Sequence, residues 1–388
     1  MKLKLRLKDK TGRPVRPANR MASFFAGVRS HAGSAQASQA AAAMFGLAGP
    51  LAVGVMTGHL RAGLAAALGG LALGGGAKGE TPGEQASALI YALAAGGAAM
   101  LTGSALTGKA PAAAFGIAAV AAAAGLIGSI SRPLARATTR YILYTIIAAN
   151  LGAPGTHVLG MTLMFLLGAC WTAALSLILR PLFKAMGPAP DPTLPANAVR
   201  LPKYTAGQQL RRWRKSLARL SGWQYVLRIG SCLAAAAAFE SIWPLHHGYW
   251  VSITVVIVVQ RNLQTALTRT FHRAAGTVLG VLLISLLLLI TPPIWALLLI
   301  IAALSAVRPI LLETNYTAYA AVMTPLVILL LDFGQDPSWA AVVDRLAATL
   351  AGCFLALTLG YLGWSRLSPP ARFRVKSKIE SAPQIIGK

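Results

Sequence analysis

Two charged residues, Asp344 and Arg345, lie next to each other in an otherwise apolar stretch, "VVDRLAATLAG", which covers residues 342–352. An ionisable side chain inside a bilayer is costly and usually faces a cavity or a partner, so it is a candidate functional residue. The guanidinium of Arg345 can hold a carboxylate through two parallel hydrogen bonds. A carboxylate such as Asp344 can take up and release a proton, so the pair predicts a proton-coupled anion site. The alternative is a structural role, in which both side chains reach the interface or pair with other helices.

Arg345 belongs to a motif that occurs twice in the sequence. Residues 273–280 read "RAAGTVLG" and residues 345–352 read "RLAATLAG", and both follow the pattern R-x-x-x-T-x-x-G. An apolar block with a threonine precedes each copy, with Thr254 before the first and Thr324 before the second. The copies are three predicted helices apart, and an odd offset gives them opposite orientations in a membrane. Such inverted repeats are common in secondary transporters, and the motif glycines favour close helix packing.

The motifs and their surroundings supply the candidate site residues. The candidate substrate-binding residues are Arg345, Arg273, Arg228, Thr254, Thr324 and Thr349, and the candidate proton-coupling residues are Asp344, Glu240 and His247. Each has an alternative explanation. The threonine hydroxyls can bond to their own helix backbone, and cytoplasmic placement alone explains Arg273. Arg228 and Glu240 are about 18 Å apart along one helix. His247 lies at the predicted outer mouth, where a histidine can sense pH or stand in a wet loop.

One predicted crossing is unusually short. Its apolar run extends only from Tyr249 to Val259 before Gln260 interrupts it. A short or broken segment within a transporter repeat points to a binding site. The alternative is a helix that continues through Asn262.

The composition indicates that these residues are positioned by membrane helices. Hydrophobic residues make up 56% of the chain and charged residues 12%, whereas soluble domains are about 25% charged. Apolar windows recur at lengths that cross a bilayer as helices and exceed those of barrel strands. We predict an all-α polytopic membrane protein with about twelve transmembrane helices in two six-helix halves, each a three-plus-three inverted repeat. The crossings are expected to begin near Ala37, Leu60, Glu84, Pro111, Arg136, Thr156, Gly222, Gly248, Thr265, Pro293, Tyr316 and Trp339.

The sequence divides into five segments. They are a basic N-terminal segment (1–35), the first membrane half (36–183), a linker (184–221), the second half (222–366) and a C-terminal tail (367–388). Within the linker, "LRRWRKSLARL" predicts an amphipathic helix on the inner membrane surface, with a solvated basic linker as the alternative. A direct repeat relates the halves, because Gly97 and Thr145 align with Gly276 and Thr324 at one offset. The first half lacks the arginine of the motif.

The net charge of +26 follows from topology. The basic residues fill alternate gaps between apolar windows, and such gaps are cytoplasmic in membrane proteins. We therefore expect both termini in the cytoplasm. This alternation disfavours a nucleic-acid-binding protein, whose basic residues would form one patch.

The region of the first motif resembles a known family. Residues 246–280, "HHGYWVSITVVIVVQRNLQTALTRTFHRAAGTVLG", resemble the signature region of the fusaric-acid-resistance (FUSC) family of aromatic acid exporters, and the second motif is also similar. The resemblance is clear over about residues 225–365 and weak over 36–183. It implies export of small, mostly aromatic carboxylic acids across a bacterial inner membrane, in some members with a periplasmic membrane-fusion protein. The six-helix unit also resembles plant aluminium-activated malate transporters, which conduct organic anions.

Three functions fit these features: a proton-coupled exporter of organic anions, an organic-anion channel, or an envelope-associated protein without transport activity. The sequence contains no metal-ligand spacing, phosphate-binding loop or catalytic triad, so we expect no cofactor, metal or enzymatic activity. The expected partners are the lipid bilayer, a small organic acid and a membrane-fusion protein, without nucleic acid. A monomer and a homodimer both remain open.

Overall fold

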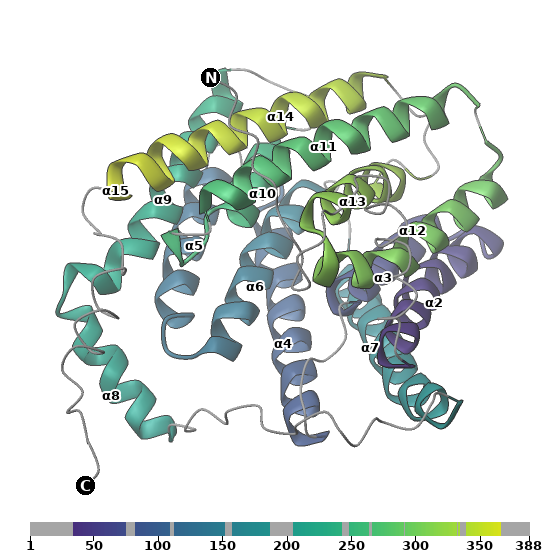
Figure 1. The fold of residues 1–388 in the computed structure, drawn as a ribbon, viewed down its shortest axis with the longest axis horizontal. Helices are drawn as coiled ribbons and strands as arrows, with labels where there is room; N and C mark the ends of the chain where they lie inside the picture. The colour runs from purple at the N-terminus through teal and green to yellow at the C-terminus, as the bar shows by residue number, and fades with distance from the viewer. Residues whose placement is uncertain are drawn as a thin grey trace, which may run out of the picture.

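The computed structural model describes residues 34–74, 82–108, 112–151, 157–186, 205–242, 248–263, 266–290, 292–331, 333 and 339–365, and these residues are almost entirely helical (Figure 1). The first half contains α2 (Ser34–Met56), α3 (Leu60–Leu73), α4 (Pro82–Leu106), α5 (Ala112–Ile127), α6 (Arg132–Leu151) and α7 (Val158–Met186). The second contains α9 (Leu220–Ile242), α10 (Tyr249–Val258), α11 (Ala266–Leu288), α12 (Ile294–Thr314), α13 (Tyr316–Leu331) and α14 (Trp339–Leu357), which continues into the π-helix η2 (Thr358–Leu362) and α15 (Gly363–Ser365). Each predicted crossing thus corresponds to one helix, and the all-α class is confirmed.

Seven of these helices are long and apolar enough to cross a membrane: α2, α4, α7, α9, α11, α12 and α14. Four others, α3, α5, α10 and α13, are shorter apolar helices. The helix α6 is long enough but carries Arg132, Arg136 and Arg140 in its first half. Large apolar side chains such as Phe115 and Phe354 are exposed on the outside, as expected where lipid covers the surface. The chain is a multi-pass membrane protein, and the count of twelve crossings stays a prediction.

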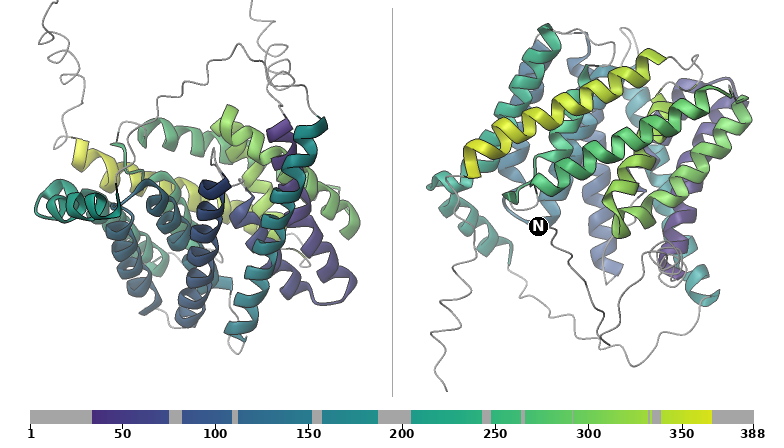
Figure 2. Two further views of the ribbon diagram at one scale, coloured as in Figure 1. Left: turned by 90° about the horizontal axis from the view of Figure 1, so that it is seen from below. Right: turned by 45° about the horizontal axis from the view of Figure 1, so that its top comes forward.

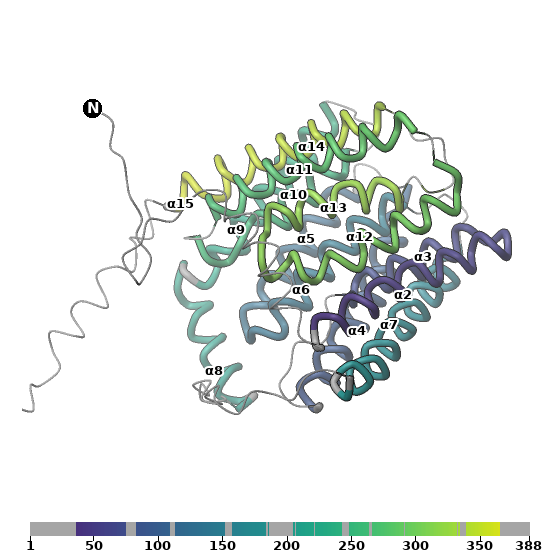
Figure 3. Tube along the Cα trace, turned by 45° about the vertical axis from the view of Figure 1, so that its right-hand side comes forward, coloured from purple at the N-terminus to yellow at the C-terminus, as the bar shows by residue number. Residues whose placement is uncertain are grey.

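The two halves pack their helices in the same pairs. In the first half α4 packs on α6 and α3 packs on α7, while in the second α11 packs on α13 and α10 packs on α14. The contacts between halves also correspond, because α2 packs on α12 and α5 packs on α9. Figure 3 shows the bundle of α2, α3 and α7 on the opposite side of the molecule from α11 and α14. Within the second half, α9, α10 and α11 correspond in order to α12, α13 and α14. Under this correspondence the packed pair α10–α14 matches the packed pair α11–α13.

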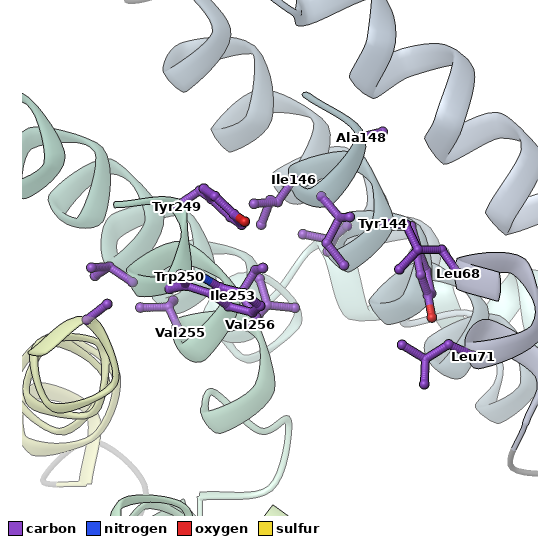
Figure 4. Packing of buried hydrophobic residues seen from close by; sticks show 14 of the residues in the cluster. Leu68, Leu71, Tyr144, Ile146, Ala148, Tyr249, Trp250, Ile253, Val255 and Val256 are labelled. Atoms are coloured by element: carbon purple, nitrogen blue, oxygen red, sulfur yellow. The ribbon is translucent and has the colours of Figure 1, made fainter. Parts of the chain in front are cut away.

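The short helix α10 lies at the centre of the molecule. It ends at Val258, so the short apolar helix inferred from the sequence is confirmed, and it does not continue through Asn262. At ten residues it is about 15 Å long, too short to cross a bilayer by itself. It packs against α6, α9, α11 and α14, and nine of its residues are buried. Figure 4 shows Tyr249 and Trp250 on α10, and Ile146 on the facing α6. A broken helix of this kind is tolerated at membrane depth because protein surrounds it.

The linker forms an amphipathic helix, as predicted. Helix α8 (Ala206–Leu217) begins four residues earlier than the stretch that predicts it, because Thr205 and Gln208 form a reciprocal capping box at its N-terminus. The indole Nε1 of Trp213 donates to the carbonyl of Leu126, 3.0 Å away, at the end of α5. This bond fixes α8 against the ends of the membrane helices.

Candidate anion site

Arg345 is buried in the interior of the second half. Its side chain is 1% exposed, and its guanidinium carbon lies 3.5 Å from the ring centre of Trp250 on α10. A cation over an indole face gains about 2 kcal/mol when water is excluded. That gain does not replace the hydrogen bonds lost on burial, because Nε and Nη1 have no partner among the described residues. Buried N–H groups without acceptors are unfavourable, so this guanidinium favours binding of an acceptor-rich group.

Arg273 on α11 adds a second buried cation. Its side chain is 2% exposed, and its Nε likewise has no hydrogen-bond partner within the described part of the chain. The helices α11 and α14 lie side by side (Figure 2, right), with the thiol of Cys353 3.9 Å from the carbonyl oxygen of Thr270. Both arginines are buried, and the helices that carry them pack against each other. The two arginines therefore form one electropositive region, which an anion would stabilise.

Three buried hydroxyl groups complete this region. Thr254, Thr277 and Thr349 are 0% exposed, and the structure gives their Oγ1 atoms no hydrogen-bond partner in the residues that it describes. Thr277 and Thr349 each follow a motif arginine by four residues, so each shares a helix face with that arginine. We call Arg273, Arg345, Thr254, Thr277 and Thr349 the arginine–threonine site. Each of its residues has a buried donor without a partner among the described residues.

The motif glycines bring the helices of this site together. A Cβ atom on Gly352 would lie 2.7 Å from the Cβ of Thr254, and one on Gly280 would lie 2.6 Å from the Cβ of Thr324. Each motif glycine therefore packs on the threonine that precedes the other copy of the motif. Only glycine permits so close an approach. The matched residues of the repeat thus occupy matched positions in space.

Thr324 and Asp344 differ from the site residues in their surroundings. The Thr324 hydroxyl donates to the carbonyl of Ala320, 3.0 Å away on its own helix, which is the alternative that the sequence left open for the threonines. The Asp344 side chain is buried. It precedes Arg345 on α14, so the two side chains leave the helix about 100° apart.

Arg228 and Glu240 lie outside the arginine–threonine site. The Nε of Arg228 donates to the carbonyl of Gly360 in η2, and Nη1 donates to the carbonyl of Gln260, 2.9 Å away, just after α10. Gly360 is about 22 Å along the helix from Arg345. Arg228 therefore ties together the ends of two helices. Glu240 accepts a hydrogen bond of 3.0 Å from Ser252 on α10. His247 lies outside the described residues.

Trp250, which lies against the site, was not among the candidate residues drawn from the sequence. Thr277 is the threonine of the first motif, so the repeat that selects Thr349 selects it equally. Trp250 precedes Thr254 by four residues and therefore shares its helix face. This spacing could have added Trp250 to the candidate residues, but it does not reveal that the indole ring covers Arg345.

Comparison with known proteins finds a family match within the second half of the chain. Residues 233–359 match the family described as fusaric acid resistance protein-like. This matched segment contains the whole arginine–threonine site, and the resemblance drawn from the sequence is confirmed over it.

Two curated relatives match a similar length of chain. A protein of Neisseria gonorrhoeae named "Uncharacterized protein ORF2" is 29% identical over 133 residues, which are 34% of this chain and 32% of the relative. An "Uncharacterized protein" of Haemophilus influenzae is 27% identical over 133 residues, 34% of this chain and 18% of the relative. The matches therefore span about a third and about a fifth of these relatives. No solved structure matches the chain.

Proposed function

We propose that this protein is a secondary transporter of the bacterial inner membrane that exports small organic, mostly aromatic, carboxylic acids, with proton coupling. The arginine–threonine site carries this proposal. A carboxylate only accepts hydrogen bonds and can bind a guanidinium through two parallel contacts. It would supply acceptors to Arg345, Arg273 and the buried hydroxyls, all of which have unused donors. The Trp250 ring beside Arg345 offers a flat apolar surface for an aromatic substrate.

The proposed architecture has twelve crossings, with both termini in the cytoplasm. Each half would be an inverted repeat of three plus three helices. The exchanged contacts, Gly280 with Thr324 and Gly352 with Thr254, support this arrangement. Transporters built on such repeats bind substrate near the middle of the membrane, where the repeats meet, and expose the site to each side in turn. The contact between α11 and α14 is that meeting point here.

Proton coupling requires a group that can exchange a proton near the substrate. Asp344 is the first candidate because it is buried and adjoins Arg345. Glu240, near the end of α9, and His247 remain further candidates. A periplasmic membrane-fusion protein is proposed as a partner on the resemblance alone.

A flux measurement tests the proposed function. Purified protein in liposomes is loaded with radiolabelled benzoate, and its release is followed with and without a proton gradient. Replacing Arg345 by Ala removes two charge-assisted hydrogen bonds, so we expect flux to fall about a hundredfold or more. Arg180→Ala is the matched control, because Arg180 is exposed on α7. Wild-type flux through correctly inserted Arg345→Ala protein would disprove the assignment.

The same assay separates the alternatives. Flux that follows voltage and ignores the pH gradient would indicate an organic-anion channel. Absence of benzoate flux, and of flux of other aromatic acids, from the unmodified protein would favour an envelope-associated role.

A further inference from the structure

A second group of unused donors lies next to the arginine–threonine site, at the beginning of α11 and α13. The guanidinium carbon of Arg269 lies 4.5 Å from the ring centre of Tyr316. The Nε of Arg269 and the hydroxyl of Tyr316 are both buried atoms for which the described residues provide no hydrogen-bond partner. Neither residue belongs to the repeated motif. We call this pair the inner-end pair.

The inner-end pair is in line with the anion site. Arg269, Arg273 and Thr277 follow one another at intervals of four residues on α11, so they share one face of the helix. Neighbouring members are about 6 Å apart along the axis. A carboxylate bound at Arg269 is thus one helical turn from Arg273. The three residues provide a continuous row of donors that leads from the end of α11 to the interior.

The surroundings leave this row electropositive. The Tyr319 ring stacks on Tyr316 at 5.7 Å between ring centres, which holds the Tyr316 ring in place under Arg269. Glu313, three residues before Tyr316, accepts a hydrogen bond from Gln36 on α2. Arg269 is only partly buried as a residue, whereas Arg273 is fully buried. Access therefore decreases from Arg269 to Arg273, as expected of a route that begins at the surface.

We propose that Arg269 and Tyr316 form a second anion-binding site, which receives the organic carboxylate on the cytoplasmic side before it passes to Arg273 and Arg345. This inference rests on the proposed function, since the charge pattern of the loops places the starts of α11 and α13 in the cytoplasm. The Arg269 guanidinium and the Tyr316 hydroxyl would both donate to the carboxylate. The carboxylate would bind first at Arg269 and Tyr316 and then at Arg273 and Arg345, and neither step changes a covalent bond.

The test compares uptake from the two sides of the membrane. Benzoate transport is measured in inside-out and right-side-out vesicles with the full-length chain. Because Arg269→Ala removes a charge-assisted hydrogen bond, we expect the half-saturating benzoate concentration on the cytoplasmic side to rise about tenfold or more. The half-saturating concentration on the outer side should stay unchanged.

Tyr316→Phe keeps the ring below Arg269 and removes only the hydroxyl. We expect it to raise the cytoplasmic half-saturating concentration about threefold to tenfold. Tyr319→Phe is the matched control and should have no effect on either side. Arg269→Lys keeps the positive charge but loses the planar set of guanidinium donors. Its half-saturating benzoate concentration on the cytoplasmic side should therefore lie between those of the wild type and Arg269→Ala. Membrane levels and size-exclusion profiles of all variants establish that they fold.

The outcomes distinguish the two proposals. If Arg345→Ala abolishes flux while Arg269→Ala and Tyr316→Phe match the wild type on the cytoplasmic side, the inner-end pair is not a binding site. Equal changes on both sides would also overturn the proposal, because they indicate a general structural effect. If the unmodified protein transports no organic acid, the proposed function fails and this inference fails with it.

Discussion

The two halves of the molecule place very different side chains at matching positions. Gly352 on α14 packs against α10, and Gly168 on α7 packs in the same manner against Ala66 on α3. Three residues before each glycine, the second half has Thr349 and the first half has Phe165. Seven residues before, the second half has Arg345 and the first half has Met161. One scaffold therefore supports a polar centre in one half and an apolar one in the other.

In the first half, Phe165 occupies the position that corresponds to Thr349 in the second half. Its side chain is 1% exposed, and its ring meets that of Tyr144 edge-on at 5.4 Å. A Cβ on Gly96 of α4 would lie 2.6 Å from the same ring. The first half is thus closely packed where the second has unused donors. This comparison teaches that the fold alone does not create the arginine–threonine site, because the matching positions of the first half are apolar.

The largest expected effect is the loss of packing in the first half. Phe165→Ala should destabilise the protein by about 3 to 5 kcal/mol, because it leaves a cavity against Tyr144 and Gly96. Thermal unfolding in detergent measures this change. The control is Leu167→Ala on the same helix, which is exposed to lipid and should have little effect. Equal stability of the two variants would contradict the view that the first half is a packed scaffold.

Arg345→Met makes the second half resemble the first at this position. We expect benzoate flux to fall about a hundredfold, or about 2.7 kcal/mol, since the carboxylate loses its main donor. Thermal stability should stay equal or rise, because an apolar side chain replaces a buried cation whose donors are unused. A strong loss of stability with normal flux would instead make Arg345 a structural residue.

Gly352→Ala tests whether the close contact between α10 and α14 positions the site. The added Cβ would lie 2.7 Å from Thr254, so we expect a cost of about 1 to 3 kcal/mol in stability, together with weaker benzoate binding. Gly230→Ala on α9 is the control, because its Cβ would meet nothing within 4 Å. Thermal unfolding and flux of both variants, measured side by side, give the comparison.

The smallest expected effect comes from a single hydroxyl group. Thr349→Val preserves the shape of the side chain and removes a donor that the site offers to substrate. The half-saturating benzoate concentration should rise about threefold to tenfold. Thr324→Val should leave it unchanged, because that hydroxyl already bonds to Ala320. If the two variants behave alike, the Thr349 hydroxyl is not a ligand.

Much of the helical framework follows directly from the sequence. Each predicted crossing starts within a few residues of the first residue of an observed helix. Apolar windows, and the Gly and Pro residues between them, mark the boundaries of membrane helices. Some boundaries differ by a few residues: α9 begins at Leu220 rather than near Gly222, and α6 begins at Arg132 rather than near Arg136. The motif pattern also selected Arg345, Arg273 and Thr349, because a spacing of four residues places side chains on one helix face.

The partners of each polar side chain could not be predicted in the same way. Arg228 and Arg345 are both arginines within apolar helices, and the sequence makes both of them candidate substrate-binding residues. In the structure Arg228 donates to the carbonyls of Gln260 and Gly360, whereas two nitrogen atoms of Arg345 have no partner in the described ranges. Those carbonyls are 32 and 132 residues away in sequence, so local pattern does not reveal them.

The sequence by itself determined that this is a helical membrane protein, where its helices lie, and which motif occurs twice. These properties depend on hydrophobicity and on spacing along a single helix, which are local. Only the tertiary structure decided that the helices of Arg273 and Arg345 pack together, that Trp250 covers Arg345, and that Phe165 is buried at the matching position of the first half. The physical reason is that a buried charge acquires its role from the groups that surround it, and helix packing brings those groups from distant parts of the chain.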